Sequence, residues 1–92
     1  MPPTNLTRLL ASIGKDAFVR HFELFRDLHT PNEEIVAKLP PEYTLKSRQS
    51  RVSKARRIIR EGLSRDALEI IAASTKLAPE TVSKARSLLN HI

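Results

Sequence analysis

The sequence predicts an all-α fold, in which one compact domain contains five or six short helices. Alanine, leucine and isoleucine make up most of the apolar residues of the 92-residue chain, which has only two glycines. The runs of β-branched and aromatic residues that strands favour are scarce. The apolar residues also recur at helical spacing. A chain of this length buries roughly 60 to 65 percent of its unfolded surface, so we expect one modest core.

Residues 1–30 are expected to form two N-terminal helices. The first begins after a capping Thr4 or Asn5 and ends at Gly14. Its inward residues are Leu6, Leu9, Leu10 and Ile13. The second spans about residues 15–28 and contains three of the four aromatic residues of the chain, so we expect it to anchor the core. Its buried stripe consists of Phe18, Val19, Phe22 and Phe25.

Residues 31–62 are expected to form a pair of helices. The run 30–33 combines a capping threonine, a proline at the first helical position and a glutamate three residues after the cap. The helix that it opens is expected to end near Leu39, because two prolines follow. The second helix of the pair begins within residues 45–47 and closes at Gly62, a natural left-handed C-terminal residue.

Residues 63–92 are expected to form a C-terminal helical pair. Ser64 can cap a helix that spans residues 65 to about 74, and residues 75–78 form a turn. Pro79 then opens the last helix at its first position. The inward residues of that helix are Val82, Ala85, Leu88 and Leu89.

The positive charge is concentrated in one helix-length stretch. Residues 46–60 hold seven of the sixteen basic residues and no acid, whereas the rest of the chain carries nine basic and ten acidic residues. The net charge of +6 therefore lies in this stretch. Its pentapeptide Val-Ser-Lys-Ala-Arg, at 52–56, recurs unchanged at 82–86. Such a stretch favours a polyanion partner, most often nucleic acid, because lysine and arginine gain affinity by displacing condensed counterions.

Helix geometry divides the basic stretch into two faces, since successive residues are about 100° apart. The inward residues are Val52, Ala55, Ile58 and Ile59. The outward residues are Lys46, Ser50, Ser53 and Arg57, bordered by Gln49, Lys54 and Arg60. Arg48 projects near the apolar face, and Arg51 and Arg56 lie at its borders. We expect these three to reach backbone phosphates or to lie in an irregular first turn.

Residues 32–60 resemble the helix-turn-helix unit of DNA-binding domains. Residues 34–39 (Glu-Ile-Val-Ala-Lys-Leu) look like the supporting first helix of that unit, and residues 47–60 look like its recognition helix. The resemblance implies that the first half of the recognition helix enters a major groove. The implied contacts to base edges are Gln49, Ser50, Ser53 and Lys54. The implied contacts to phosphates are Lys46, Arg51, Arg57 and Arg60.

The connection between these two helices departs from the motif. Six residues, two of them prolines, separate Leu39 from Lys46, where the motif usually has three or four. A weaker resemblance covers residues 66–89, where a turn of about four residues fits better but the outward face carries no cation. We expect this second pair to serve in core packing or as the interface of a homodimer. Binding of DNA by both pairs in tandem stays an alternative.

No metal site, cofactor or enzymatic activity is predicted. The three histidines lack the spacing of metal ligands, and the chain has no cysteine. It also lacks a glycine-rich phosphate loop and a nucleophile elbow. No apolar run approaches the roughly 20 residues of a membrane span, and residues 1–5 lack the features of a secretory signal. We therefore expect a cytoplasmic protein with no membrane partner.

The expected function is that of a small transcriptional regulator that binds duplex DNA through residues 46–60. Tyr43 alone is expected to be free to stack on bases, which argues against proteins that bind single strands on exposed aromatic rings. Two alternatives stay open. One is a binder of structured RNA, and the other is a non-catalytic adaptor whose basic helix docks on an acidic protein surface.

Overall fold

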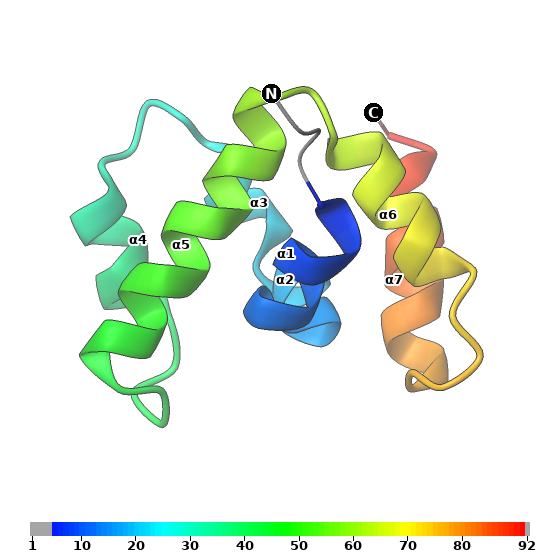
Figure 1. Ribbon diagram of the computed structural model, residues 1–92, viewed down its shortest axis with the longest axis horizontal. Coiled ribbons are helices and arrows are strands. Elements are labelled where there is room, and N and C mark those ends of the chain that lie inside the picture. Colours follow the sequence, from blue (N-terminus) through cyan, green and yellow to red (C-terminus); the bar gives the residue numbers. More distant parts are fainter. Residues whose placement is uncertain (1–4, 92) are drawn as a thin grey trace.

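The computed structural model describes residues 5–91 and is all-α, as predicted (Figure 1). Within that range it contains seven helices and no strand. They are α1 (Leu6–Ile13), α2 (Lys15–Arg20), α3 (Phe22–Arg26), α4 (Asn32–Lys38), α5 (Leu45–Arg60), α6 (Ser64–Ala72) and α7 (Pro79–Leu89). Five of these helices have seven residues or more, and the two shorter ones result from a break in one expected helix.

The break lies at His21, between α2 and α3. His21 has φ −110° and ψ 18°, and its carbonyl accepts hydrogen bonds from the N–H groups of Leu24 and Phe25 at 3.0 and 3.1 Å. The phenylalanine rings pack across this break. The centroid of Phe18 lies 5.5 Å from that of Phe22 and 6.2 Å from that of Phe25. The predicted aromatic stripe is therefore buried as one cluster, although it comes from two helices instead of one.

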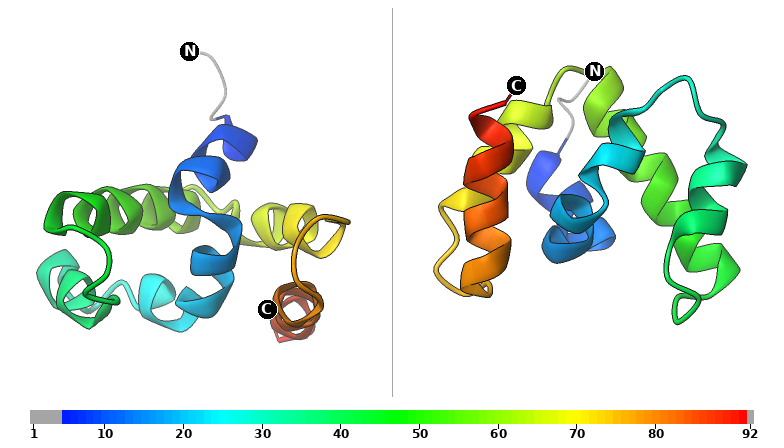
Figure 2. Two further views of the ribbon diagram at one scale, coloured as in Figure 1. Left: turned by 90° about the horizontal axis from the view of Figure 1, so that it is seen from below. Right: turned by 180° about the vertical axis from the view of Figure 1, so that it is seen from behind.

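Helix α5 occupies the centre of the fold. It packs against α1, α3, α4 and α6, while α7 packs against α6 and α2. Helices α1 and α4 lie on different sides of α5 (Figure 2). The largest buried apolar side chains are those of Leu10, Ile13, Phe18, Phe22, Phe25, Ile35, Ile58, Leu68 and Ile71. Because its neighbours surround only part of α5, one long side of this helix stays in contact with solvent.

Several predicted helix ends are confirmed. Asn5 caps α1, since its side-chain oxygen accepts from the Arg8 N–H at 3.0 Å, and Thr4 lies outside the described residues. Gly14 and Gly62 have φ of +91° and +73°, and each follows the end of a helix. Pro79 is the first residue of α7.

Two expected caps are wrong. The Thr30 hydroxyl does not cap α4, because it donates to Asp27 Oδ2 at 2.6 Å, and Pro31 holds the capping position. Ser64 is the first residue of α6 and not its cap, which is Leu63 without a side-chain hydrogen bond. A threonine hydroxyl three residues after an aspartate has a charged acceptor within reach, and that local bond takes the place of the cap.

The connectors within the two helical pairs have equal lengths. Residues 39–44 join α4 to α5, and residues 73–78 join α6 to α7, so each connector has six residues. The expected turn of about four residues in the C-terminal pair is wrong, because α6 ends at Ala72 instead of near Ser74. Neither connector has the three or four residues that are usual in a helix-turn-helix motif. That likeness therefore stays a sequence prediction.

Arg56 is a buried cation at the centre of the molecule, where only 2% of its surface is exposed. Its Nη1 donates to Asn32 Oδ1 at 2.6 Å, and its Nη2 donates to the Asp27 carbonyl at 2.6 Å and to the Thr30 carbonyl. All three acceptors are neutral and lie in or next to the segment between α3 and α4. The expectation that Arg56 reaches phosphates is wrong. This side chain joins α5 to the segment before α4.

The two copies of the pentapeptide provide a matched test of this role. Arg56→Ala removes three charge-assisted hydrogen bonds and opens a cavity, and we expect it to lower the free energy of unfolding by roughly 2–4 kcal/mol. Arg86 is at the same place in the second copy but is exposed, so Arg86→Ala should change stability by less than about 0.5 kcal/mol. Urea unfolding followed by circular dichroism measures both values. Equal effects would contradict the assigned role of Arg56.

Candidate nucleic-acid interface

The solvent side of α5 is a continuous stripe of polar side chains, which we call the outer stripe. It consists of Lys46, Gln49, Ser50, Ser53, Lys54, Arg57 and Arg60. Ser50 and Lys54 are half-buried, and the other five residues are exposed. On the opposite side Val52, Ala55 and Ile58 are fully buried. The two faces predicted from helix geometry are confirmed.

Local sequence accounts for the length and position of α5. The Thr44 hydroxyl oxygen accepts from the Ser47 N–H at 3.1 Å, which satisfies one of the free donors at the start of the helix. The sixteen residues that follow include no glycine or proline, and seven of them are arginine or lysine, which favour helix. Arg57 and Arg60 lie in the last turn, where the helix dipole favours cations. The outer stripe therefore lies on one uninterrupted helix.

The cations of the outer stripe are available to a ligand. Lys46, Lys54 and Arg60 make no side-chain hydrogen bond or ion pair within the described part of the chain. Arg57 Nε lies 2.9 Å from Glu61 Oε2, but both side chains are largely exposed. Exposed pairs of this kind contribute about 0.2–1 kcal/mol, so a phosphate can replace Glu61 at small cost.

The order of residue types along the outer stripe suits the groove of a nucleic-acid duplex, which has negatively charged phosphates along its edges. Lys46 stands near one end of α5, and Arg57 and Arg60 stand near the other. At a rise of about 1.5 Å per residue, the ends of this stripe lie roughly 20 Å apart. The short neutral side chains of Ser50 and Ser53 lie between them. Cations at both ends can bind phosphates, while small polar groups between them allow close approach to base edges.

Arg51, a predicted phosphate contact, is engaged inside the fold. Its Nε donates to Ser47 Oγ at 3.1 Å, and its Nη1 donates to the Ile13 carbonyl at the end of α1. Its guanidinium lies over the Tyr43 ring, 4.0 Å from the centroid. The expectation that Tyr43 is free to stack on bases is therefore wrong. We do not include Arg51 among the proposed contacts.

The inward position of Arg51 agrees with that of two further arginines of α5. Arg48 Nη1 donates to the Val36 carbonyl in α4 at 3.2 Å, and Arg56 is buried. Three of the seven cations of this helix thus serve the interior. Their place at or near the borders of the apolar face was the available signal in the sequence. A long arginine side chain at such a border can reach inward to a carbonyl as easily as outward to a phosphate.

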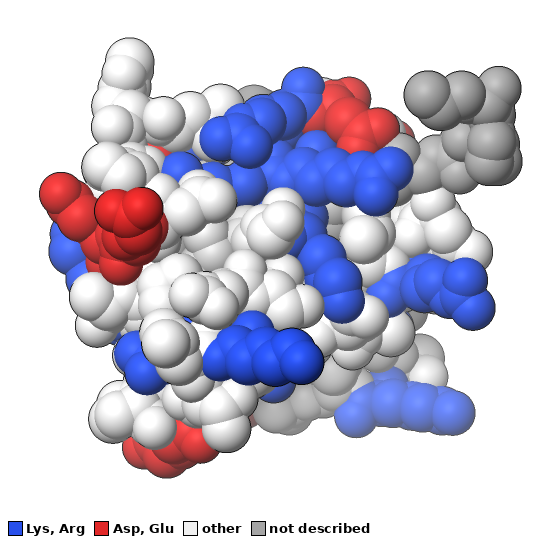
Figure 3. Space-filling model, turned by 60° about the vertical axis from the view of Figure 1, so that its left-hand side comes forward, with Lys and Arg blue, Asp and Glu red and all other residues white. Residues whose placement is uncertain are grey.

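The distribution of charge over the surface agrees with this division. In Figure 3 lysine and arginine side chains are spread over the side of the molecule formed by α4 and α5, and acidic side chains gather toward its margins. Lysine and arginine exceed aspartate and glutamate by sixteen to ten over the whole chain. The outer stripe holds four of these cations and no acid.

Gly14 permits the close approach of α1 to Arg51. Its φ is +91°, a conformation that other residues rarely adopt. A Cβ atom at this position would also lie 3.1 Å from Arg51 Nη1. The absence of a side chain thus lets the guanidinium reach the last carbonyl of α1. Gly62 has a φ of +73°, but a Cβ atom there would meet nothing within 4 Å.

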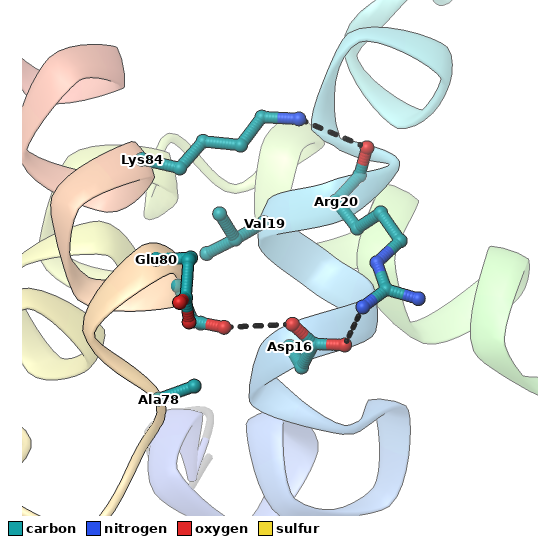
Figure 4. Close-up of a pocket in the computed structure, with 7 residues that line it drawn as sticks. Asp16, Val19, Arg20, Ala78, Glu80 and Lys84 are labelled. Carbon is teal, nitrogen blue, oxygen red and sulfur yellow. Dashed lines mark hydrogen bonds and ion pairs between the residues drawn. The ribbon is translucent and has the colours of Figure 1, made fainter.

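A hollow of about 400 Å³ lies between α2 and α7, away from the outer stripe (Figure 4). Four of the residues that line it bind one another. Asp16 accepts from the Thr81 hydroxyl at 2.7 Å and pairs with Arg20 at 2.9 Å, while Lys84 Nζ donates to the Arg20 carbonyl at 3.3 Å. These bonds dock α7 on α2. Lys84 belongs to the second copy of the pentapeptide, so this copy takes part in packing.

His21 lies near the same junction, and the charged side chains there affect its pKa. Burial lowers the pKa of His21 below its ordinary value of 6.5, and the cations Arg20 and Lys84 lower it further, whereas Asp16 acts in the opposite direction. The folded state therefore favours the neutral imidazole.

No protein-family model, curated protein or solved structure matches this chain. Among residues 5–91, no three or more histidine, aspartate or glutamate side chains are grouped so that they could hold a metal ion. No helix in the same range is long and apolar enough to span a membrane. The assignment of the outer stripe as the candidate site therefore rests on its geometry and charge.

His21 gives the stability of the fold a defined pH dependence. Because its pKa is lowered on folding, its contribution is fully present above about pH 6.5 and is lost as the pH falls through the lowered value. Urea midpoints measured between about pH 7.5 and pH 5 should decline less for His21→Gln than for the parent protein. His29→Gln, at an exposed position, should keep the parent decline. An identical decline in His21→Gln would contradict this assignment.

Alanine substitutions at the two glycines distinguish the effect of backbone strain from that of a steric clash. Gly62→Ala introduces strain alone, and we expect it to destabilise the fold by about 1–2 kcal/mol. Gly14→Ala adds a contact with Arg51, so its effect should be larger, about 2–3 kcal/mol. Thermal and urea unfolding measure the difference. The assigned contact between Gly14 and Arg51 would be wrong if Gly62→Ala proved the more damaging change.

Proposed function

We propose that this protein binds duplex DNA through the outer stripe of α5 and acts as a small transcriptional regulator. One observation carries the proposal: an exposed helix face presents four cations and no acid, with short neutral residues between its charged ends. Each cation that neutralises a phosphate releases condensed counterions, and this release supplies most of the affinity. The neutral residues Gln49, Ser50 and Ser53 are the proposed contacts to base edges, together with Lys54.

Dimensions favour DNA over RNA. A helix with its side chains is about 10–12 Å wide, and the major groove of B-DNA is about 12 Å wide. The corresponding groove of an RNA duplex is deep and narrow, so side chains do not reach its bases. Binding of single strands usually needs exposed aromatic rings. The phenylalanines are buried and Tyr43 is covered by Arg51, which leaves little for stacking.

The proposal places the protein in the cytoplasm, in line with the absence of cysteine from the chain. Self-association through α6 and α7 is a separate proposal with weaker support. Ile70, Leu77, Leu88 and Leu89 are only partly buried there. The large hydrophobic residues that are most exposed in the described chain, Leu28 and Leu45, lie elsewhere. Sedimentation of the free protein decides whether a dimer forms.

A second candidate function has one observation in its favour. Leu45, at the start of α5, is 57% exposed and borders a hollow of about 240 Å³ that Val36 and Gln49 also line. An acidic protein partner that placed an apolar side chain there would use the same helix as an adaptor surface. A partner recovered equally well with and without nuclease treatment supports the adaptor, whereas complete loss of partners after nuclease opposes it.

Fluorescence anisotropy of a labelled random duplex tests the DNA proposal. With three to five phosphates engaged, log affinity should fall against log salt with a slope of about −3 to −4.5 between roughly 50 and 200 mM salt. Replacement of Lys54 and Arg60 together by glutamine should reduce the slope by about 2, because each cation accounts for about 0.9.

Two controls make this result specific. Lys76→Gln removes an exposed cation from the connector before α7 and should leave the slope unchanged. Circular dichroism should show both variants folded, since Lys76 is exposed and neither Lys54 nor Arg60 makes a side-chain hydrogen bond or ion pair within the described residues. If the parent protein binds no duplex at the lower salt, the proposal fails. A slope unaffected by the double substitution removes these two residues from the interface.

A further inference from the structure

Helix α1 borders one edge of the outer stripe. The edge is identified by Arg51, whose Nη1 donates to the Ile13 carbonyl at the end of α1. Lys54 lies one turn further along the same flank of α5 and is half-buried. The opposite flank faces α4, because Leu45 and Gln49 line a hollow there together with Val36 of α4. In the view from below in Figure 2, α1 projects from α5 on the side away from α4.

The solvent side of α1 has the composition of a phosphate contact surface. Its exposed residues, with the cap, are Asn5, Thr7, Arg8, Ala11 and Ser12. Arg8 makes no side-chain hydrogen bond or ion pair within residues 5–91. Residues 5–15 include no acid that could neutralise it. Thr7, Ala11 and Ser12 are short, so they do not hinder the approach of a sugar-phosphate backbone.

Contacts of Arg51 hold α1 against α5. Arg51 joins the two helices, and Ser47 and the Tyr43 ring hold its guanidinium in place. Gly14 supplies the backbone conformation and the space that this contact needs. A cation on α1 is therefore held at a constant place beside the stripe. Such preorganisation lowers the entropic penalty when a rigid ligand binds both helices.

We propose that Arg8 is a phosphate contact and that α1 holds one strand of the duplex whose groove receives α5. This inference rests on the proposed function. A helix within a major groove has a phosphate backbone on each side, and elements that flank it in the fold meet those backbones. Helix α1 flanks α5 at the Lys54 edge, so it meets the strand on that side. The site for duplex DNA thus consists of the outer stripe and the solvent side of α1.

The test compares how removal of a positive charge at Arg8, at Arg60 and at Lys76 changes the salt dependence of DNA binding. Anisotropy titrations of a random duplex between about 50 and 200 mM salt are made with Arg8→Gln, Arg8→Lys, Arg60→Gln and Lys76→Gln. Arg8→Gln should reduce the salt slope by about 0.9, while Arg8→Lys, which keeps the charge, should retain it. Arg60→Gln should reduce the slope by a similar amount, and Lys76→Gln should leave it unchanged.

The outcomes separate this inference from the proposal on which it rests. A slope reduced by Arg60→Gln but not by Arg8→Gln overturns the contact by α1 and keeps α5 as the interface. A slope reduced equally by Arg8→Gln and Lys76→Gln shows a general effect of net charge and also overturns it. Absence of binding by the parent protein overturns both proposals.

A second measurement locates the duplex without removing a cation. Because the chain contains no cysteine, Ala11→Cys creates a single attachment point for an iron chelate on the exposed side of α1. Bound duplex should then be cleaved in its backbone when the iron is activated. Ala73→Cys, at an exposed position after α6, is the matched control and should give only background cleavage. Equal cleavage from both positions would contradict the inference.

Discussion

The arrangement of this fold depends on arginine side chains of α5 that donate to backbone carbonyls of its neighbours. Arg51 donates to the Ile13 carbonyl, the last of α1, and Arg48 donates to the Val36 carbonyl in the last turn of α4. Arg56 donates to the carbonyl of Asp27, the residue that caps the end of α3. The last carbonyls of a helix have no partner within it and carry its negative dipole end. The Val36 and Asp27 carbonyls also accept from the N–H groups of Leu39 and Thr30, at 3.3 and 3.2 Å, whereas no backbone donor reaches the Ile13 carbonyl within residues 5–91. One helix thus donates to carbonyls at the ends of three others.

This mode of attachment explains why a strongly basic helix can occupy the centre of a small domain. A buried arginine needs partners for most of its donors, and carbonyls near helix ends can accept from them. The Nη atoms of Arg48 and Arg56 that point to such carbonyls are paired in this way, while the buried Nε atoms of both residues have no partner. The attachment also divides the charge of α5. Arg48, Arg51 and Arg56 point to the neighbouring elements, and the four cations of the outer stripe remain toward solvent. The same residue types therefore build the fold and supply the candidate interface.

The predictable parts of the structure are those set by local chemistry. The two faces of α5 follow from apolar spacing, and the ends at Gly14 and Gly62 follow from the conformations that glycine allows. The break at His21 was not predictable, because no glycine or proline marks it and the packing of Phe18, Phe22 and Phe25 across it depends on tertiary contacts. The Thr30 cap failed for a similar reason, since its hydroxyl had a competing acceptor in Asp27.

The repeated pentapeptide also shows how far local sequence determines the position of a side chain. In the first copy Val52 and Arg56 are buried, whereas in the second Val82 is only half-buried and Arg86 is exposed. Only the alanine, Ala55 or Ala85, is fully buried in both. Identical local sequence thus fixes the helix and its central contact but not the direction of a long side chain. For the candidate site, the count of cations was predictable, and the number that face solvent was not.

The division of charge also bears on how a polyanion acts on the protein. The outward cations have few acidic partners, so a duplex that binds them replaces water and counterions and breaks no interior contact. Binding then requires no rearrangement of α5, whose position the inward arginines already fix. A ligand that binds only the folded state stabilises it by mass action, by about 2.7 kcal/mol at a concentration one hundred times its dissociation constant. The inward arginines accordingly set both the stability of the free domain and the rigidity of the surface it presents.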